Sequence, residues 1–132
     1  MRSGTSLTNA LLEGAKAEVV VAGCVPTVVY APGAWEIPLL IRHHLEETKP
    51  YAVVAVGCVL QGQTAHAQLL ARDVSSALMS LQMSHGVPIG WGILTPDTAE
   101  QALERAGMKH GNKGREAAMA ALATAALLEK PR

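Results

Sequence analysis

The chain has 132 residues, of which 49% are hydrophobic and 17% charged, and its formal net charge at pH 7 is zero. This length is enough to bury a substantial core, so we expect one domain over residues 1–132. The balanced charge argues against nucleic acid or an anionic membrane as the main partner, and a neutral, apolar-rich domain favours self-association.

The lengths of the apolar runs and the spacing of the cysteines bear on the cellular compartment in which the protein is expected. The longest runs, Tyr51–Leu60 and Ala117–Leu128, are shorter than the ~18–20 residues of a membrane span. The first residues lack a basic and then apolar leader, so we expect no signal peptide. Cys24 and Cys58 have no metal-ligand spacing and are interpreted as reduced, buried thiols. Together these features predict a cytoplasmic protein.

The first half of the chain predicts helix, strand, helix and strand. Leu7–Ala22 carries apolar residues at the spacing of one helical face and ends at a glycine. Thr27–Ala31 (TVVYA) predicts a short strand closed by Pro-Gly, and a helix follows over about residues 34–47. Ala52–Leu60 is apolar on both faces, which is typical of a central parallel strand.

The second half continues this alternation. A helix capped by Thr64 is expected to run to about His85, and Val87–Leu94 predicts another strand. Asp97 and Glu100 have capping-box spacing before a short helix, and an alanine-rich helix follows the basic loop at 109–114. Alternating strands and helices with short connections predict an α/β fold, with helices on both faces of a parallel sheet.

Ligands in such sheets bind beyond the carboxyl ends of the strands, where Pro32–Glu36, Gln61–His66 and Trp91–Thr95 are expected. The turn formed by Gln63 and Thr64 leads from a strand into a helix, so its N–H groups could hold a phosphate or simply cap the helix. His66 follows in the first helical turn. There the positive helix end favours a neutral ring that transfers protons near pH 7, although a surface histidine is the plainer interpretation.

Five further residues are candidates for binding. Trp35 and Trp91 are expected in strand-end loops, where they could stack on a planar heterocycle or fill the core. Glu36 could hydrogen-bond a ligand or serve as an acidic residue at a helix start. Arg105 complements a helix C-terminus, whereas Lys113 near a helix start indicates an anionic partner. No histidine pair has zinc-site spacing, so no metal site is expected. The histidines other than His66 are expected at solvated positions or helix ends; they are His43, His44, His85 and His110.

Four segments carry a resemblance: PGAWEIP (32–38), GCVLQGQTAH (57–66), GVPIGWGILTPDTAEQALERAG (86–107) and GNKG (111–114). They resemble the lumazine synthase family, in family order, across nearly the whole chain. The resemblance implies a flavodoxin-like three-layer sandwich that assembles as homopentamers, sometimes as sixty-subunit shells, with the active site between adjacent subunits. It also implies a transferase of riboflavin biosynthesis. That enzyme condenses 5-amino-6-(D-ribitylamino)uracil with 3,4-dihydroxy-2-butanone 4-phosphate to 6,7-dimethyl-8-ribityllumazine, without metal or organic cofactor.

The resemblance also implies roles by position. His66 matches the proton-transfer histidine, and Arg105 of the neighbouring subunit matches the cation that faces the phosphate. Lys113 matches a basic residue on the phosphate side, and Trp91 matches an aromatic contributed across the interface. The phosphate turn contains Gln63 and Thr64, and the pyrimidine and ribityl pocket is lined by Ala34, Trp35, Glu36, Cys58, Val59 and Leu60.

Two departures from the family pattern are visible. The family begins with a strand that ends in an Arg-aromatic-Asn-like turn, whereas this sequence has Ser3 at the aromatic position and no such strand. We expect residues that precede Met1 in the natural protein, or another segment or subunit, to fill that place. Gln61 replaces a common arginine beside the phosphate turn. The leading hypothesis is therefore a lumazine synthase; the alternatives are a weakly active or non-catalytic ligand-binding or shell-forming paralogue, and an unrelated flavodoxin-like binding module.

Overall fold

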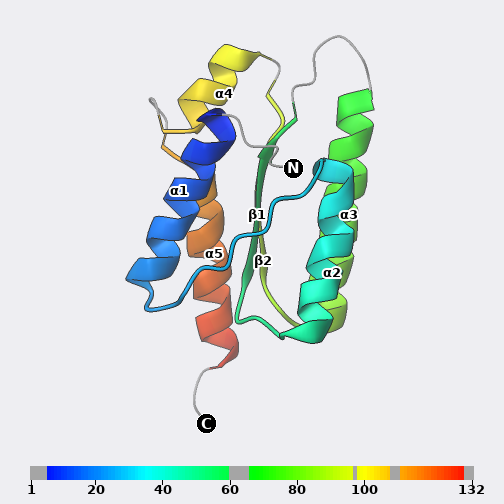
Figure 1. Ribbon diagram of the computed structural model, residues 1–132, viewed down its shortest axis with the longest axis vertical. Helices are drawn as coiled ribbons and strands as arrows, with labels where there is room; N and C mark the ends of the chain where they lie inside the picture. The colour runs from blue at the N-terminus through cyan, green and yellow to red at the C-terminus, as the bar shows by residue number, and fades with distance from the viewer. Residues whose placement is uncertain (1–5, 60–65, 97, 108–110, 130–132) are drawn as a thin grey trace.

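A computed structural model describes residues 6–59, 66–96, 98–107 and 111–129. Helices and strands alternate along the chain (Figure 1). In chain order they are α1 (Ser6–Val21), the 3-10 helix η1 (Ala34–Glu36), α2 (Ile37–Glu47), β1 (Val53–Cys58), α3 (His66–His85), β2 (Ile89–Leu94), α4 (Ala99–Arg105) and α5 (Lys113–Leu128).

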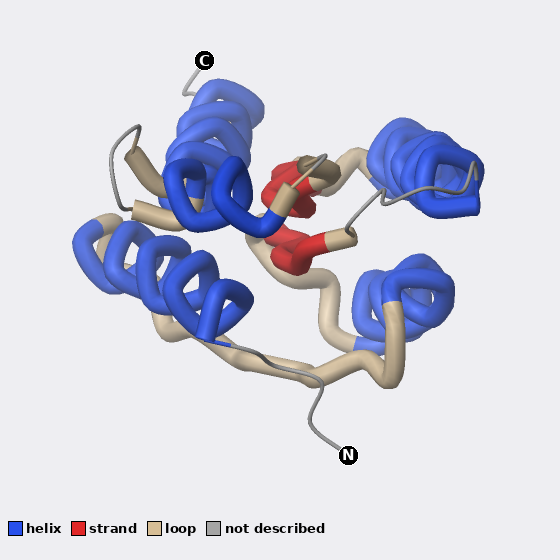
Figure 2. Tube along the Cα trace, turned by 90° about the horizontal axis from the view of Figure 1, so that it is seen from above, coloured by secondary structure: helices blue, strands red, loops and turns tan. Residues whose placement is uncertain are grey.

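The two strands form a parallel pair at the centre of the molecule. Their register runs from Val53 opposite Ile89 to Cys58 opposite Leu94, and α3 makes the crossover between them. Seen from above, α1 and α5 cover one face of this pair, and α2 and α3 cover the other (Figure 2). The α/β sandwich with a short parallel sheet, expected from the sequence, is confirmed.

Different side chains fill the two faces. On the side of α2 and α3, the core consists of aliphatic residues that are almost fully buried: Ile41, Leu45, Ala55, Val74, Leu78 and Ile93. On the side of α5 the packing is closer. A Cβ added to Gly90 would lie 2.4 Å from the carbonyl oxygen of Ala117. Only a glycine in β2 lets the backbone of α5 approach the strand this closely.

Helix ends follow the sequence closely. Gly23, Gly86 and Gly107 follow the ends of α1, α3 and α4 with φ values of +84°, +68° and +112°, in the left-handed region that favours glycine. α1, α3 and α5 end within one residue of the predicted positions. Within the described residues, no helix has the length and apolar character to cross a membrane.

The predicted strand at Thr27–Ala31 is wrong. Residues 24–31 cross from the end of α1 to η1 past β1 without joining the sheet (Figures 1 and 2). Val28 is 37% exposed and Val29 is 49% exposed, so neither is part of a closed core. β-branched residues favour extended backbone, but a strand also needs a neighbour to pair with. Ser3, at the position of the family's aromatic residue, lies outside the described residues.

The capping box predicted from Asp97 and Glu100 is also not what begins α4. The N-cap is Thr98, whose backbone is extended and whose side-chain oxygen accepts a hydrogen bond from the N–H of Gln101 at 3.1 Å. Asp97 itself lies outside the described residues. Both residue types are good N-caps, so composition alone did not identify the right one.

Candidate functional site

The carboxyl ends of the two strands meet at one end of the molecule. The N–H of Val59, directly after β1, donates a hydrogen bond to the carbonyl of Leu94, the last residue of β2, at 2.8 Å. The described part of α3 begins nearby in sequence with His66, and α3 packs against η1. This end of the sheet therefore gathers the segments on which the sequence placed a ligand.

The η1 segment presents three of the predicted residues. Ala34 is half-buried and packs, like Val59, against the core between α2 and α3. Trp35 is 64% exposed, and Glu36 is exposed as well. An indole that leaves most of its surface in solvent contributes little to the protomer's own core, so its flat face is available to a ligand or to another chain.

His66 is exposed at the amino end of α3, as the sequence predicted. Here the ring can exchange protons with a ligand or with water. The neighbouring Leu60, Gln63 and Thr64, together with Gln61, lie outside the described residues. The position of His66 relative to a phosphate-binding turn therefore stays a prediction.

Cys58 ends β1 and is half-buried. Burial raises the pKa of its thiol above the ordinary value, because a thiolate would lose hydration there. A thiol that stays protonated near neutral pH is a weak nucleophile. Cys58 can therefore line a pocket but is poorly suited to covalent catalysis.

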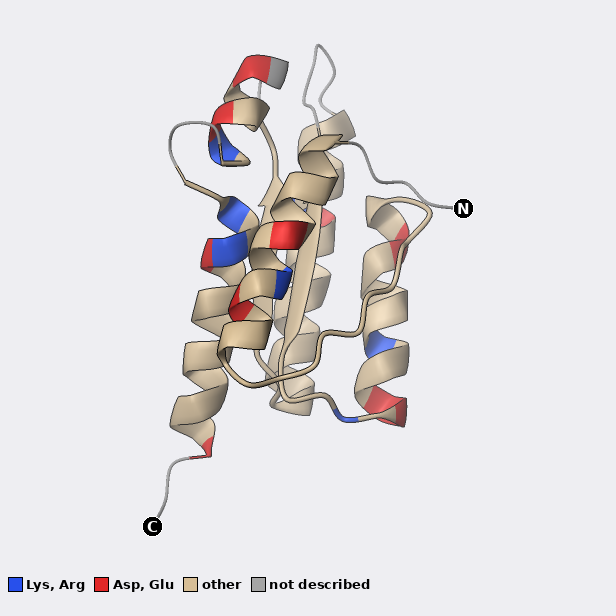
Figure 3. Cartoon of the chain, turned by 60° about the vertical axis from the view of Figure 1, so that its left-hand side comes forward, with Lys and Arg blue, Asp and Glu red and all other residues tan. Residues whose placement is uncertain are grey.

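A cavity of about 430 Å³ lies beside β2 and contains two cationic side chains. Arg105 is the last residue of α4 and Lys113 is the first residue of α5. Figure 3 shows basic residues at these two helix ends on neighbouring parts of the molecule. In the described chain, neither cation has a carboxylate within ion-pair distance. The lining residues are Trp91, Ile93, Leu94, Thr95, Arg105, Lys113 and Glu116.

Trp91 reaches this cavity from an unexpected position. The sequence placed it in a strand-end loop, but it is the third residue of β2 and is half-buried against the core. The strand predicted over Val87–Leu94 already contained this residue, so the two expectations disagreed; the strand is confirmed and the loop position is wrong. Gly90 and Gly92 instead allow close backbone packing, since an added Cβ on each would lie within 3.0 Å of a carbonyl oxygen.

Glu116 is a lining residue that the sequence interpretation missed. It follows Lys113 by three residues on α5, so the two side chains lie on the same side of the helix. Helical periodicity applied to the predicted Lys113 could have found it. Its carboxylate adds one negative charge to a cavity with two positive ones, which leaves a net attraction for an anion.

The predicted residues thus form two groups. Arg105, Lys113 and Trp91 line one cavity, and none of the η1 residues, Cys58, Val59 or His66 lies in its lining. The second group belongs to η1, the end of β1 and the start of α3. Among the residues that the structure describes, no single pocket is lined by both groups.

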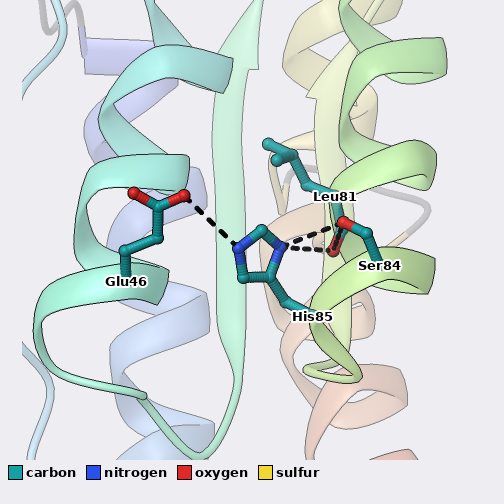
Figure 4. Close-up of polar contacts among 4 residues, drawn as sticks. All are labelled: Glu46, Leu81, Ser84 and His85. Atoms are coloured by element: carbon teal, nitrogen blue, oxygen red, sulfur yellow. Dashed lines mark hydrogen bonds and ion pairs between the residues drawn. The ribbon is translucent and has the colours of Figure 1, made fainter.

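Another histidine forms a contact at the far end of α3 (Figure 4). His85 Nε2 lies 3.7 Å from the Glu46 carboxylate, and its Nδ1 lies 3.2 Å from the carbonyl oxygen of Leu81 and 3.1 Å from the hydroxyl of Ser84. This set joins the C-terminal ends of α2 and α3. The interpretation of His85 as a helix-end residue is confirmed. Within the described ranges, no three His, Cys, Asp or Glu side chains gather as a metal site would require.

The order of these segments agrees with one known family over almost the full length. The family model of 6,7-dimethyl-8-ribityllumazine synthase matches residues 2–129. The chain belongs to this family. Lumazine synthases are also found among individual relatives. One from Azorhizobium caulinodans is 47% identical over 122 residues, which cover 89% of this chain and 75% of the relative.

Two further lumazine synthases give similar values. The protein of Edwardsiella ictaluri is 45% identical over 120 residues, covering 88% of this chain and 77% of its own. The protein of Yersinia pestis is 44% identical over 126 residues, which cover 92% of this chain and 80% of the relative. The matches cover most of this chain, so the resemblance to the family drawn from short motifs is confirmed.

Proposed function

We propose that this chain is a transferase of riboflavin biosynthesis, a lumazine synthase. It condenses 5-amino-6-(D-ribitylamino)uracil with 3,4-dihydroxy-2-butanone 4-phosphate and releases phosphate and water. The observation that carries the proposal is the cavity lined by Arg105 and Lys113, which holds two cations that have no described carboxylate partner beside an aromatic ring. Family membership supplies the reaction.

The cationic cavity suits the phosphate-bearing substrate. A guanidinium donates two parallel hydrogen bonds to a phosphate, and an ammonium adds a point charge. Phosphate leaves during the reaction, so negative charge develops on the departing group. Fixed cations next to that group stabilise the transition state as well as the bound substrate.

The second group suits the pyrimidine substrate and proton transfer. His66 is assigned the proton transfers that accompany imine formation, elimination and ring closure. The proposed pyrimidine and ribityl pocket consists of Ala34, Trp35, Glu36, Cys58, Val59 and Leu60, and the proposed phosphate turn contains Gln63 and Thr64. Holding two reactants in register accounts for much of the rate in such a condensation.

We assign the complete site to the contact between two copies of the chain. In the described part of the chain His66 does not line the cavity with Arg105, and Trp35 is 64% exposed. A neighbouring copy that brings its Arg105 to the His66 group would cover this surface. The resemblance to the family implies five copies, so we propose a homopentamer as the working assembly. We place it in the cytoplasm, where the two free cysteines remain reduced.

Turnover with both substrates, followed by the absorbance of the lumazine product, tests the proposal. Arg105→Ala should raise the KM for the butanone phosphate about tenfold or more, because a charged hydrogen bond is worth roughly 1.5–3 kcal/mol. His66→Ala should lower kcat modestly, by about tenfold, with little change in KM. Arg115→Ala is the matched control, since Arg115 pairs with Glu18 at 3.6 Å and does not line the cavity.

Two results would contradict the proposal. Equal behaviour of Arg105→Ala and Arg115→Ala would show that the cavity does not hold the phosphate. Tight binding of the pyrimidine without any product would indicate a non-catalytic ligand-binding protein of the same family.

A further inference from the structure

Asn112 connects the end of α4 and the start of α5, which both line the cationic cavity, to α1. It is the N-cap of α5, where its side-chain Oδ1 accepts a hydrogen bond from the N–H of Arg115 at 2.9 Å. Its Nδ2 donates to the carbonyl oxygen of Ala10 in α1, also at 2.9 Å. Its backbone forms an isolated antiparallel bridge with Ala106, the residue directly after α4.

These connections place Asn112 next to both cations. Lys113 follows it directly in the chain, and Arg105 directly precedes its bridge partner Ala106. The described chain thus holds the end of α4 and the start of α5 together at this residue. α1, which supplies Ala10, is a 16-residue helix packed along α5, so it is a rigid anchor.

The space around the Asn112 side chain is closely filled. A Cβ added to Gly14 in α1 would lie 2.6 Å from Cγ and Oδ1 of Asn112, and one added to Gly114 would lie 2.1 Å from the carbonyl oxygen of Leu11. The glycines let the amide and the start of α5 lie directly on α1. A side chain held by two hydrogen bonds and by packing on both sides has a fixed position.

We propose that Asn112 is a positioning residue for the anion-binding pair Arg105 and Lys113. The inference rests on the proposed function, because it assumes that these two cations bind the phosphate of the substrate. Asn112 touches neither substrate in this scheme. Its amide fixes the two backbone positions from which the cations reach into the cavity, so that they face one anion at the same time.

The energetic reason lies in the distances over which charged hydrogen bonds act. An N–H···O contact to phosphate is strong near 2.7–2.9 Å and is lost when donors shift outward. Displacements of about 1 Å at a positioning contact are known to cost up to about 100-fold in rate. Releasing the start of α5 from α1 should therefore weaken phosphate recognition more than it weakens the fold.

Asn112→Ser removes the hydrogen bond to Ala10 but keeps the N-cap of α5. Serine is about as good an N-cap as asparagine, so the hydrogen bond to Arg115 can be kept. Its short side chain cannot also reach the carbonyl of Ala10. Gly14→Ala perturbs the same contact from α1, where alanine is the better helix former. Ala123→Gly is the control, because it weakens α5 at an exposed position without touching Asn112.

The full chain is assayed for the KM of each substrate, for binding of inorganic phosphate and for its thermal midpoint. We expect Asn112→Ser and Gly14→Ala each to raise the KM of the phosphate substrate, and the Kd of inorganic phosphate, about tenfold. The KM of the pyrimidine should stay within about twofold. Ala123→Gly should lower the thermal midpoint and leave both KM values unchanged, because a partly unfolded population reduces kcat alone.

Arg105→Ala, measured in parallel, distinguishes a failure of the positioning role of Asn112 from a failure of the proposed function. If it weakens phosphate binding while Asn112→Ser and Gly14→Ala do not, Asn112 has no positioning role and the proposed function stands. If Arg105→Ala has no effect either, the cavity does not bind the phosphate, and both proposals are wrong. A loss of kcat alone in Asn112→Ser would also overturn the positioning role.

Discussion

Replacement of Gly90 by alanine tests the close packing of β2 on α5. The added Cβ would lie 2.4 Å from the carbonyl oxygen and 3.0 Å from the carbonyl carbon of Ala117. Both are backbone atoms in the middle of a helix, so no side-chain rotation can relieve the contact. Overpacking of a core usually costs about 1–3 kcal/mol, and a clash with backbone belongs at the upper end, near 3 kcal/mol. For a chain of this size that corresponds to a fall in Tm on the order of 10 °C.

Gly57→Ala is the matched control in the neighbouring strand. A Cβ at this position would meet only Cγ1 of Ile93 at 3.8 Å, which is an ordinary van der Waals contact. We expect its free energy of unfolding to stay within about 1 kcal/mol of the wild type, because alanine fits the strand and restricts the unfolded chain. Guanidinium denaturation at one fixed protein concentration measures both variants, since assembly adds to apparent stability. If Gly90→Ala were as stable as Gly57→Ala, the inferred contact between β2 and α5 would be wrong.

Three further predictions concern the remaining contacts. Leu45→Ala should destabilise the fold by about 2–5 kcal/mol in guanidinium denaturation, because Leu45 is 2% exposed, whereas Leu39→Ala on the same helix, at a site 62% exposed, should change stability by less than about 0.5 kcal/mol. Glu46→Gln should cost less than about 1 kcal/mol at low salt and nothing measurable at about 1 M salt, since its contact with His85 is half exposed; a large loss at high salt would contradict this. Iodoacetamide should modify Cys58 more slowly in the folded than in the unfolded protein at neutral pH, because burial raises the pKa of its thiol. The stability that the protonated thiol contributes should be lost as the pH rises through that raised pKa.

Local signals in the sequence predicted most of the helices. Glycines with positive φ follow α1, α3 and α4 where the sequence placed the stops. Helix ends are set by residues within one turn, so they can be interpreted without knowing the rest of the fold. For the same reason the sequence placed His66, Arg105 and Lys113 correctly at helix ends.

The sequence predictions were wrong or incomplete for features that depend on contacts between distant segments. The segment Thr27–Ala31 has strand composition, but whether it pairs is decided by its neighbours. Trp91 was placed in a strand-end loop, whereas its flanking glycines make room for the backbone of distant segments: Gly90 faces Ala117 in α5, and Gly92 faces Ala55 in β1. Asn112 was not singled out, since its hydrogen bond reaches Ala10, 102 residues away. No local pattern carries such information.

The narrow sheet has a consequence for handling the protein. Within the described residues β1 and β2 pair only with each other, so in this part of the chain each strand has one side without a strand neighbour. Val25, in the segment between α1 and η1, is 89% exposed. Unpaired strand sides recruit other chains without regard to the intended partner. We expect the refolding yield to fall steeply as the protein concentration rises. At high expression levels we expect newly made chains to precipitate unless the growth temperature or the inducer concentration is reduced.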